Sequence, residues 1–163
     1  MPEIELWTHG NQVQVQDPEN LADLSVTRWS FGAELSLTPQ ANPPQDKLYT
    51  LNLGIPTPVV IDSAPCNLDE IFLKFNTFFK GKVQSVGSSG EIRRVDVFDG
   101  AVRLTTFTDI LEGTDVMQIY PLNPLHPVSN AIQISLGYRF ETVDRGAFLI
   151  IGVGARFIYP ANV

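Results

Sequence analysis

Apolar and polar residues alternate along several segments of the chain, with the period of two that is typical of strands buried on one face. The clearest segments are residues 26–37 and 131–141, and shorter ones lie at 12–16 and 48–55. Within 26–37 the odd-numbered residues share the face that we expect to be buried, and Trp29 is among them. These segments predict strands that each turn one side toward a common core.

Turn signals separate these strands. The pair Asp99-Gly100 lies between the alternating segments 92–98 and 102–108, and this arrangement predicts a tight antiparallel hairpin. Loops are predicted where Pro, Asn, Gly or Ser gather, because proline cannot donate to a strand ladder and glycine favours turns. These loops are residues 38–46, 87–90 and 121–127.

Residues 68–79 fit two descriptions. As a helix, the segment begins after the N-cap Asn67 and gathers apolar residues near one face, namely Leu68, Ile71, Phe72, Phe75 and Phe78. As a strand, alternate residues from Ile71 to Phe79 share the buried side. The phenylalanine-rich composition and the alternation elsewhere in the chain favour the strand.

Composition fits one sheet-rich domain. The chain has 163 residues, of which 44% are hydrophobic and only 18% are charged, with 12 Gly and 12 Pro. This length suits a single domain with its own core, and the many turn residues suit short strands. We therefore predict that residues 1–163 form one all-β domain, an antiparallel β-sandwich or jelly roll of about nine strands, with a closed barrel as the alternative.

Residues 148–158 depart from the alternating pattern. If the strand is regular, one face carries Leu149, Ile151, Val153, Ala155 and Phe157, and the other carries Phe148, Ile150, Gly152, Gly154, Arg156 and Ile158. A strand that is apolar on both faces is usually covered on both, here by the loop 121–127 or by a second subunit. The two glycines leave a flat strip that another backbone or a large ring could approach.

The net charge of -7, from 11 Lys and Arg against 18 Asp and Glu, argues against nucleic acid or an anionic membrane as the partner. No stretch is long and apolar enough to predict membrane insertion, and no secretory signal is visible. Cytoplasmic synthesis is expected, with release by another route left open. Cys66 is the single cysteine, which predicts no intrachain disulfide and a small core residue.

The sequence gives little sign of catalytic chemistry. His9 and His126 share no spacing typical of metal ligands, and no nucleophile motif or phosphate-binding glycine loop occurs. Calcium is a weaker alternative at two groups of turn carboxylates, which are Asp96 with Asp99, and Asp109 with Glu112 and Asp115. We predict no enzyme activity and no cofactor, and we rank a catalytic carboxylate pair from distant strands last.

Several short motifs follow one another along the chain: Trp7-Thr8-His9-Gly10, Ile55-Pro56-Thr57-Pro58, Phe98-Asp99-Gly100 and residues 132–137. Together they resemble a family of small bacterial β-sandwich proteins of unknown function. The chain departs from that pattern at residues 68–86, which look longer and richer in Phe. The resemblance implies a fold and no activity.

The main functional prediction is a non-enzymatic structural subunit that associates with itself as a homo-oligomer, filament or tubule. Its contact surface is predicted to include Ile4, Leu6, Phe148, Ile150, Gly152, Gly154 and Ile158. The segment 4–7 would add to the sheet edge of a neighbour. The alternative is a lectin-like module that binds carbohydrate, with or without calcium, through Trp7, Asp99, Asp109 and Tyr120.

Overall fold

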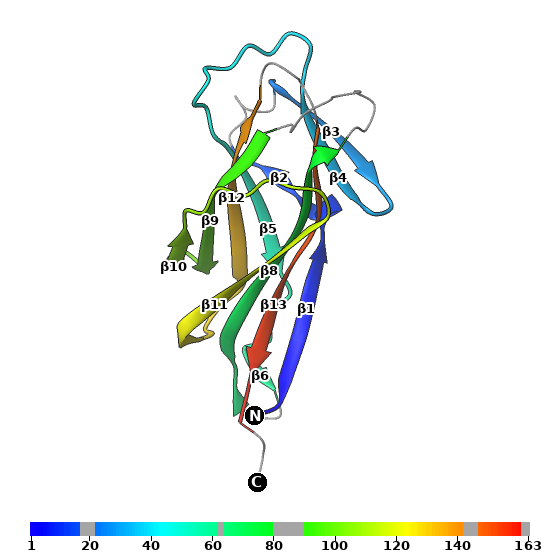
Figure 1. Cartoon of the computed structure of the whole chain (residues 1–163). Helices are drawn as coiled ribbons and strands as arrows, with labels where there is room; N and C mark the ends of the chain where they lie inside the picture. Colours follow the sequence, from blue (N-terminus) through cyan, green and yellow to red (C-terminus); the bar gives the residue numbers. More distant parts are fainter. Residues whose placement is uncertain (17–21, 62–63, 80–89, 142–146, 161–163) are drawn as a thin grey trace.

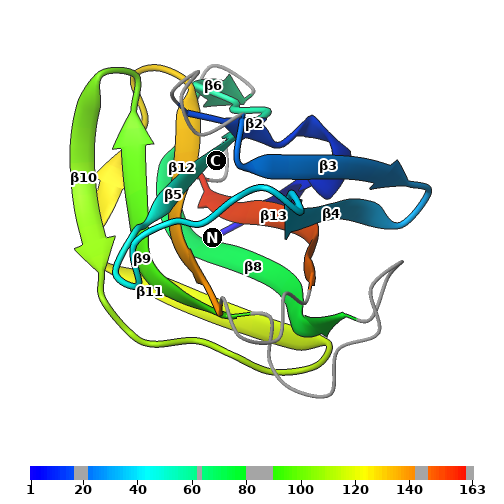
Figure 2. The same cartoon turned by 90° about the horizontal axis from the view of Figure 1, so that it is seen from above.

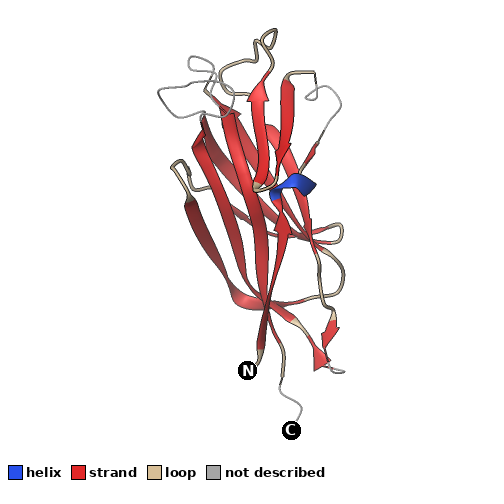
Figure 3. Cartoon of the chain, turned by 90° about the vertical axis from the view of Figure 1, so that its right-hand side faces the viewer, coloured by secondary structure: helices blue, strands red, loops and turns tan. Residues whose placement is uncertain are grey.

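The computed structural model describes residues 1–16, 22–61, 64–79, 90–141 and 147–160 (Figure 1). These residues form thirteen strands, and every strand pair is antiparallel. Figure 3 shows the one helical segment among them, the 3-10 helix η1 (Gly10–Gln12). The prediction of an all-β antiparallel sandwich is confirmed, with more strands than the nine or so expected.

Two sheets face each other (Figure 2). Sheet A has the order β11 (Val116–Pro127), β8 (Asn67–Phe79), β13 (Ala147–Ile158), β4 (Gly32–Leu37) and β3 (Leu24–Trp29), with β1 (Glu3–His9) also paired to β13. Sheet B has the order β10 (Val102–Phe107), β9 (Gly90–Asp99), β12 (Ile132–Phe140), β5 (Tyr49–Ile55) and β2 (Gln14–Val15). A separate small sheet pairs β6 (Val60–Ile61) with β7 (Ala64–Pro65).

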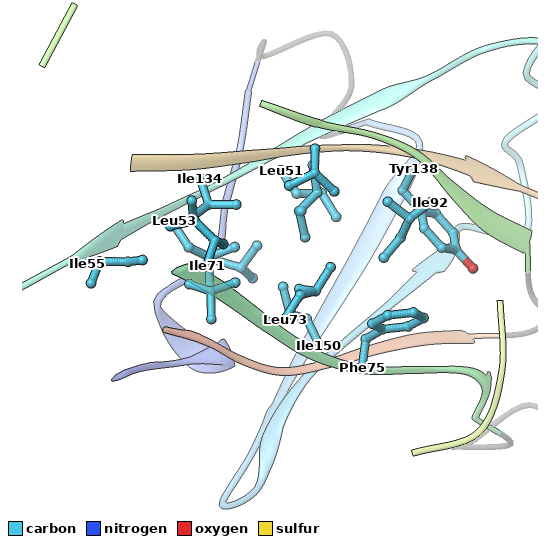
Figure 4. Packing of buried hydrophobic residues seen from close by; sticks show 14 of the residues in the cluster. Leu51, Leu53, Ile55, Ile71, Leu73, Phe75, Ile92, Ile134, Tyr138 and Ile150 are labelled. Carbon is cyan, nitrogen blue, oxygen red and sulfur yellow. The ribbon is translucent and has the colours of Figure 1, made fainter. Parts of the chain in front are cut away.

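The core lies between sheets A and B. Figure 4 shows side chains from the two sheets pointing toward one another, with Leu51, Leu53 and Ile134 on one side and Ile71, Leu73 and Phe75 on the other. Burying this apolar surface is the dominant favourable contribution to folding. The side chains on the other face of each sheet point away from this core.

A β-bulge in β13 explains why residues 148–158 are apolar at both odd and even positions. The pairing of β13 with β8 skips one residue between Ile150 and Gly152, so Ile151 has no opposite partner. The side chains that reach the core are Phe148 and Ile150 before the bulge, and Val153, Ala155 and Phe157 after it. The two faces predicted for a regular strand are therefore wrong, because the bulge exchanges them halfway along.

The bulge also marks a change of partner on the other edge of β13. Ile150 is opposite Ala33 of β4, whereas Gly152 is opposite His9 of β1. Gly10 and Gly32 both lie against the Ile150 carbonyl at this junction, where a β-carbon would approach the oxygen to 1.9 Å and 2.4 Å respectively. Glycine at both positions thus allows β1 and β4 to share one edge of β13.

Residues 26–37 form a hairpin and not the single strand that their alternation predicts. β3 ends at Trp29 and β4 begins at Gly32, with Ser30 and Phe31 in the turn. Trp29 does not enter the core. Its indole N–H donates to Oε2 of the buried Glu34 at 2.8 Å, on the outer side of sheet A.

Other local predictions have mixed outcomes. Residues 67–79 are a strand, as their composition favoured, and Asp99-Gly100 joins β9 to β10, with Gly100 at a φ of 59°. Residues 121–127, predicted to be a loop, instead extend β11, with a break in pairing between Pro121 and His126. Proline is tolerated there because β11 is an edge strand. In the loop predicted at 87–90, residues 87–89 lie outside the described residues.

Candidate binding site on the outer face of sheet A

Trp7 is an exposed aromatic side chain on the outer face of sheet A. It lies opposite Gly154 of β13, and its ring stacks on Phe72 of β8, with centroids 5.4 Å apart and planes 14° from parallel. Gly154 has no side chain to separate the two rings, so they meet above its backbone. Phe72 is buried by this packing, whereas 42% of the Trp7 surface remains exposed. The result is a fixed, solvent-accessible aromatic surface.

Cross-strand register places the neighbours of Trp7 in two rows, because opposite residues in adjacent strands project to the same side. The first row consists of Ile119, Phe72, Gly154 and Trp7, and the second consists of Met117, Lys74, Gly152 and His9. Ile119 and Met117 are both exposed. These two rows of the outer face therefore combine apolar side chains with one lysine and one histidine.

A pocket of about 320 Å³ lies beside the Trp7 ring. This volume is at the lower end of the range of ~300–1,000 Å³ that is typical of small-molecule sites. The pocket is lined by Trp7, Thr8, His9, Lys74, Ile151 and Gly152. We call this set the Trp7 pocket. The bulge in β13 contributes to it directly, because Ile151 is the unpaired residue.

His9 forms one wall of the Trp7 pocket as a neutral imidazole. Its Nδ1 accepts a hydrogen bond from the Asn11 N–H at 3.1 Å, so the ring proton must be on Nε2. Nε2 lies 3.0 Å from the Ser30 carbonyl oxygen and donates to it. One nitrogen thus contacts η1 and the other contacts the β3–β4 turn, so the role of His9 is to hold these two segments together.

The other residues of the Trp-Thr-His-Gly motif also have structural roles. Thr8 donates its hydroxyl to the Gly54 carbonyl at 2.6 Å, which links sheet A to sheet B. Gly10 packs against the Ile150 backbone at the partner change of β13. Within the motif, Trp7 presents a large apolar surface to solvent.

Lys74 is the basic group of the Trp7 pocket, and the sequence analysis did not identify it. It lies on the outer side of β8 and is partly buried between Met117 and Gly152. Its position in an alternating strand places it on the polar side. That pattern alone could not show which residues of β11 and β13 would lie beside it.

A second pocket, of about 360 Å³, lies where the edge strands β10 and β11 meet. It is lined by Leu104, Thr105, Phe107, Pro121, Leu122, Asn123, Pro124, Leu125 and His126. Although it is somewhat larger, its one aromatic side chain, Phe107, stacks on Tyr120 at 4.3 Å. The Trp7 pocket is the stronger candidate because its aromatic ring remains exposed.

Tyr120 does not present its ring to solvent, so the prediction that it stacks on a ligand is wrong. Only 3% of its surface is exposed, and it packs on Phe107 at the open side of the sandwich. Burial, together with the charge of Asp109, raises the pKa of the Tyr120 hydroxyl to about 12. Asp109 itself is exposed in the segment after β10. These two residues lie apart from the Trp7 pocket, so the four predicted ligand contacts do not form one site.

Asp99 serves a structural purpose at the β9–β10 hairpin. Its two carboxylate oxygens accept the N–H groups of Ser129 and Asn130, at 2.9 Å and 2.6 Å. His126 Nε2 lies 3.6 Å from the same carboxylate. Asp96, the other carboxylate considered for calcium, accepts the Thr106 hydroxyl at 2.6 Å and pairs with Arg94. Both carboxylates thus already have hydrogen-bond or ion-pair partners within the protein.

The predicted self-association surface is largely internal to one chain. Phe148 and Ile150 are fully buried between the sheets, so they are covered by sheet B and not by a loop or a second subunit. Trp7 and Thr8 cover Gly154 and Gly152. This outcome fits the expectation that a large ring approaches the glycine strip. The remaining predicted contacts are also buried or partly buried, namely Ile4, Leu6 and Ile158, and β1 pairs with β13 of its own chain.

Cys66 is buried, and burial raises the pKa of its thiol, although a backbone hydrogen bond from Ile61 opposes this. It therefore stays protonated at neutral pH, as a core thiol does. Across the parts of the chain that the structure describes, no three His, Cys, Asp or Glu side chains gather as a metal site would require.

Within the described residues, no helix has the length and apolar character needed to cross a membrane.

No family profile and no curated protein sequence match this chain. Among solved structures, a family two carbohydrate esterase from Cellvibrio japonicus is similar at 10% identity and a TM-score of 0.47, and this chain spans 37% of its length. The CBM36-1 domain of a multidomain xylanase from the hindgut metagenome of Trinervitermes trinervoides matches at 12% identity and a TM-score of 0.41, over 99% of this chain and all of that domain. CtCBM11 matches at 12% identity and a TM-score of 0.43, over 98% of this chain and 96% of its own. Similarities this low carry no functional argument for this chain.

Proposed function

We propose that this protein is a non-catalytic binding module that holds a carbohydrate on the outer face of sheet A, with Trp7 as its main contact. A pyranose ring has an apolar face of C–H groups and a rim of hydroxyls. An exposed aromatic surface beside polar side chains matches both features. The observation that carries the proposal is the exposed Trp7 ring, stacked on Phe72 next to the Trp7 pocket.

Preorganisation strengthens the proposal. Phe72 on one side and the Gly154 backbone beneath hold the Trp7 ring before any ligand arrives. A side chain that is already ordered loses little conformational entropy on binding, so more of the contact energy contributes to affinity. Trp is also one of the residue types enriched at energetically dominant contact positions.

The test is calorimetric titration of the protein with a panel of soluble neutral and acidic oligosaccharides. We expect binding by the wild-type protein, at least a tenfold loss in Trp7→Ala, and partial retention in Trp7→Phe, which keeps an aromatic ring. Phe31→Ala is the matched control, because it removes an exposed aromatic side chain outside the Trp7 pocket. Absence of binding to every saccharide in the panel overturns the proposal.

A second proposal keeps self-association as the function but moves it to the outer face of sheet A. Its supporting observation is that Trp7, Met117 and Ile119 are exposed on the same face, where a second copy could cover them. Light scattering would then give a mass above that of one chain, and Ile119→Lys would reduce it. A wild-type protein that stays monomeric at high concentration overturns this second proposal.

A further inference from the structure

Lys74 differs from most other cationic side chains of the protein. Five of them have a carboxylate within 4.0 Å, namely Lys47, Arg93, Arg94, Arg139 and Arg156. In the described parts of the chain, Lys74 makes no such ion pair although it is partly buried, and its cross-strand neighbours Met117 and Gly152 are uncharged. A cationic side chain that lines a pocket without a carboxylate partner can pair with an anionic group of a ligand.

We propose that the ligand of the Trp7 pocket is an acidic saccharide whose negative group pairs with Lys74 while its ring packs on Trp7. This inference rests on the carbohydrate-binding function proposed above. Trp7 and Lys74 both line the pocket, so one sugar unit can contact both side chains. Gly152, which lies between β1 and Lys74 in the same row, has no side chain to block the approach.

His9 does not compete with Lys74 for the anionic group of the ligand. Both of its ring nitrogens already bond to backbone groups, and accepting the Asn11 N–H requires a neutral ring. The pocket therefore contains one positive charge, on Lys74, among its lining residues. A single ammonium group fits one carboxylate or sulfate group as a point charge and does not impose the paired geometry of an arginine.

The charge along β8 favours one orientation of the ligand. Four residues from Lys74, Glu70 pairs with Arg156, which also lies 2.9 Å from Asp69 and 3.9 Å from Glu3. Three carboxylates around one guanidinium leave that end of the face negative, at about 13 Å from Lys74 along the strand. An acidic sugar is therefore repelled from the Arg156 end and attracted to the Lys74 end.

The experiment compares a galacturonate oligosaccharide with its methyl ester, which has the same ring and lacks the charge. We expect the wild-type protein to bind the acid about tenfold more tightly than the ester. Lys74→Gln should abolish this preference while still binding the ester, and Lys74→Arg should keep it. Arg103→Gln is the matched control, because it removes an exposed positive charge on β10, outside the Trp7 pocket.

A sulfated galactan oligosaccharide, measured in parallel against its desulfated form, tests sulfate as the other source of the negative charge. A preference for either anionic form that Lys74→Gln abolishes supports the inference. Equal binding of charged and neutral forms by the wild-type protein overturns it and leaves the carbohydrate proposal standing. Failure to bind any saccharide, charged or neutral, overturns the carbohydrate proposal itself.

Discussion

The indole ring of Trp7 lies over Gly154 so closely that a β-carbon at residue 154 would come within 2.7 Å of ring atom Cδ2. Gly154→Ala should therefore displace the ring and destabilise the protein by about 1–3 kcal/mol. The change is measurable by urea unfolding, and tryptophan fluorescence should shift toward that of a more solvated indole. Gly54→Ala is the matched control, since a β-carbon there has open space around it and should leave Trp7 undisturbed. Unchanged fluorescence in Gly154→Ala would contradict this packing.

Phe148→Lys should prevent folding. Phe148 is fully buried, packs on Phe75 and Tyr138, and has no room for an ammonium group. Burying an unpaired charge costs several kcal/mol, which is comparable with the stability of a whole domain. Circular dichroism should show loss of the strand signal, whereas Val102→Lys, at an exposed position on β10, should remain folded. A folded Phe148→Lys protein with a smaller assembly size would instead favour an intermolecular role for this residue.

Tyr120→Phe should leave the protein as stable as the wild type or stabilise it by up to about 1 kcal/mol. The Tyr120 hydroxyl is buried and has no hydrogen-bond partner among the residues that the structure describes, so its removal relieves a desolvation cost. Tyr49→Phe is the contrasting variant, because the Tyr49 hydroxyl donates to Asp23 at 2.8 Å and its loss should be destabilising. Thermal unfolding of both variants checks the prediction. A large destabilisation of Tyr120→Phe would mean that its hydroxyl has a partner.

Asp23 should make the free energy of unfolding depend on pH in the acidic range. Hydrogen bonds from Lys47 and from Tyr49, with the Lys47 charge, hold the pKa of this carboxyl below its ordinary value of 3.8, although burial opposes them. A carboxyl with a lowered pKa in the folded state stabilises that state above the unfolded pKa, and the contribution disappears as the pH falls through the folded pKa. The difference in free energy of unfolding between wild type and Asp23→Asn should thus stay constant down to about pH 5 and shrink as the pH falls further, through the unfolded and then the folded pKa.

Urea unfolding at several pH values measures that difference. Asp46→Asn is the control, because 95% of the Asp46 side chain is exposed and its contact with Arg139 is 3.7 Å long. The Asp46→Asn curve should run nearly parallel to that of the wild type. A constant gap between wild type and Asp23→Asn across this range would show that Asp23 does not titrate as expected.

Local sequence features predicted the fold class well because each depends on only a few neighbouring residues. The strand at residues 67–79 and the hairpin at Asp99-Gly100 are of this kind. Alternation failed at residues 26–37 because a two-residue turn preserves the period of two, so a hairpin and one long strand give the same pattern. The bulge at Ile151 was equally hidden, since it depends on which strands pair with β13 on its two edges.

The candidate site was only partly predictable. Trp7 could be named as a candidate ligand contact, although its place before a turn left open whether its ring is exposed. Lys74 could not, since its place in the pocket depends on the register of β8 with β13 and of β13 with β1. Tyr120 was also named as a ligand contact, but Phe107 of β10 covers its ring, and this contact between two strands is not visible in the local sequence.

The position of β13 in the middle of sheet A has a consequence for the kinetics of folding. This strand follows all of its partners in the chain, and it pairs Leu6 with Ala155 across nearly the whole sequence. Until residues 147–158 join the sheet, β1 has no pairing strand among the described residues, and β8 has an open edge. Contacts between such distant residues form late and slowly, because a long loop must close first. In any conformation in which β13 has not yet paired, the edges of β1, β4 and β8 that face it are unpaired, and unpaired strand edges favour aggregation.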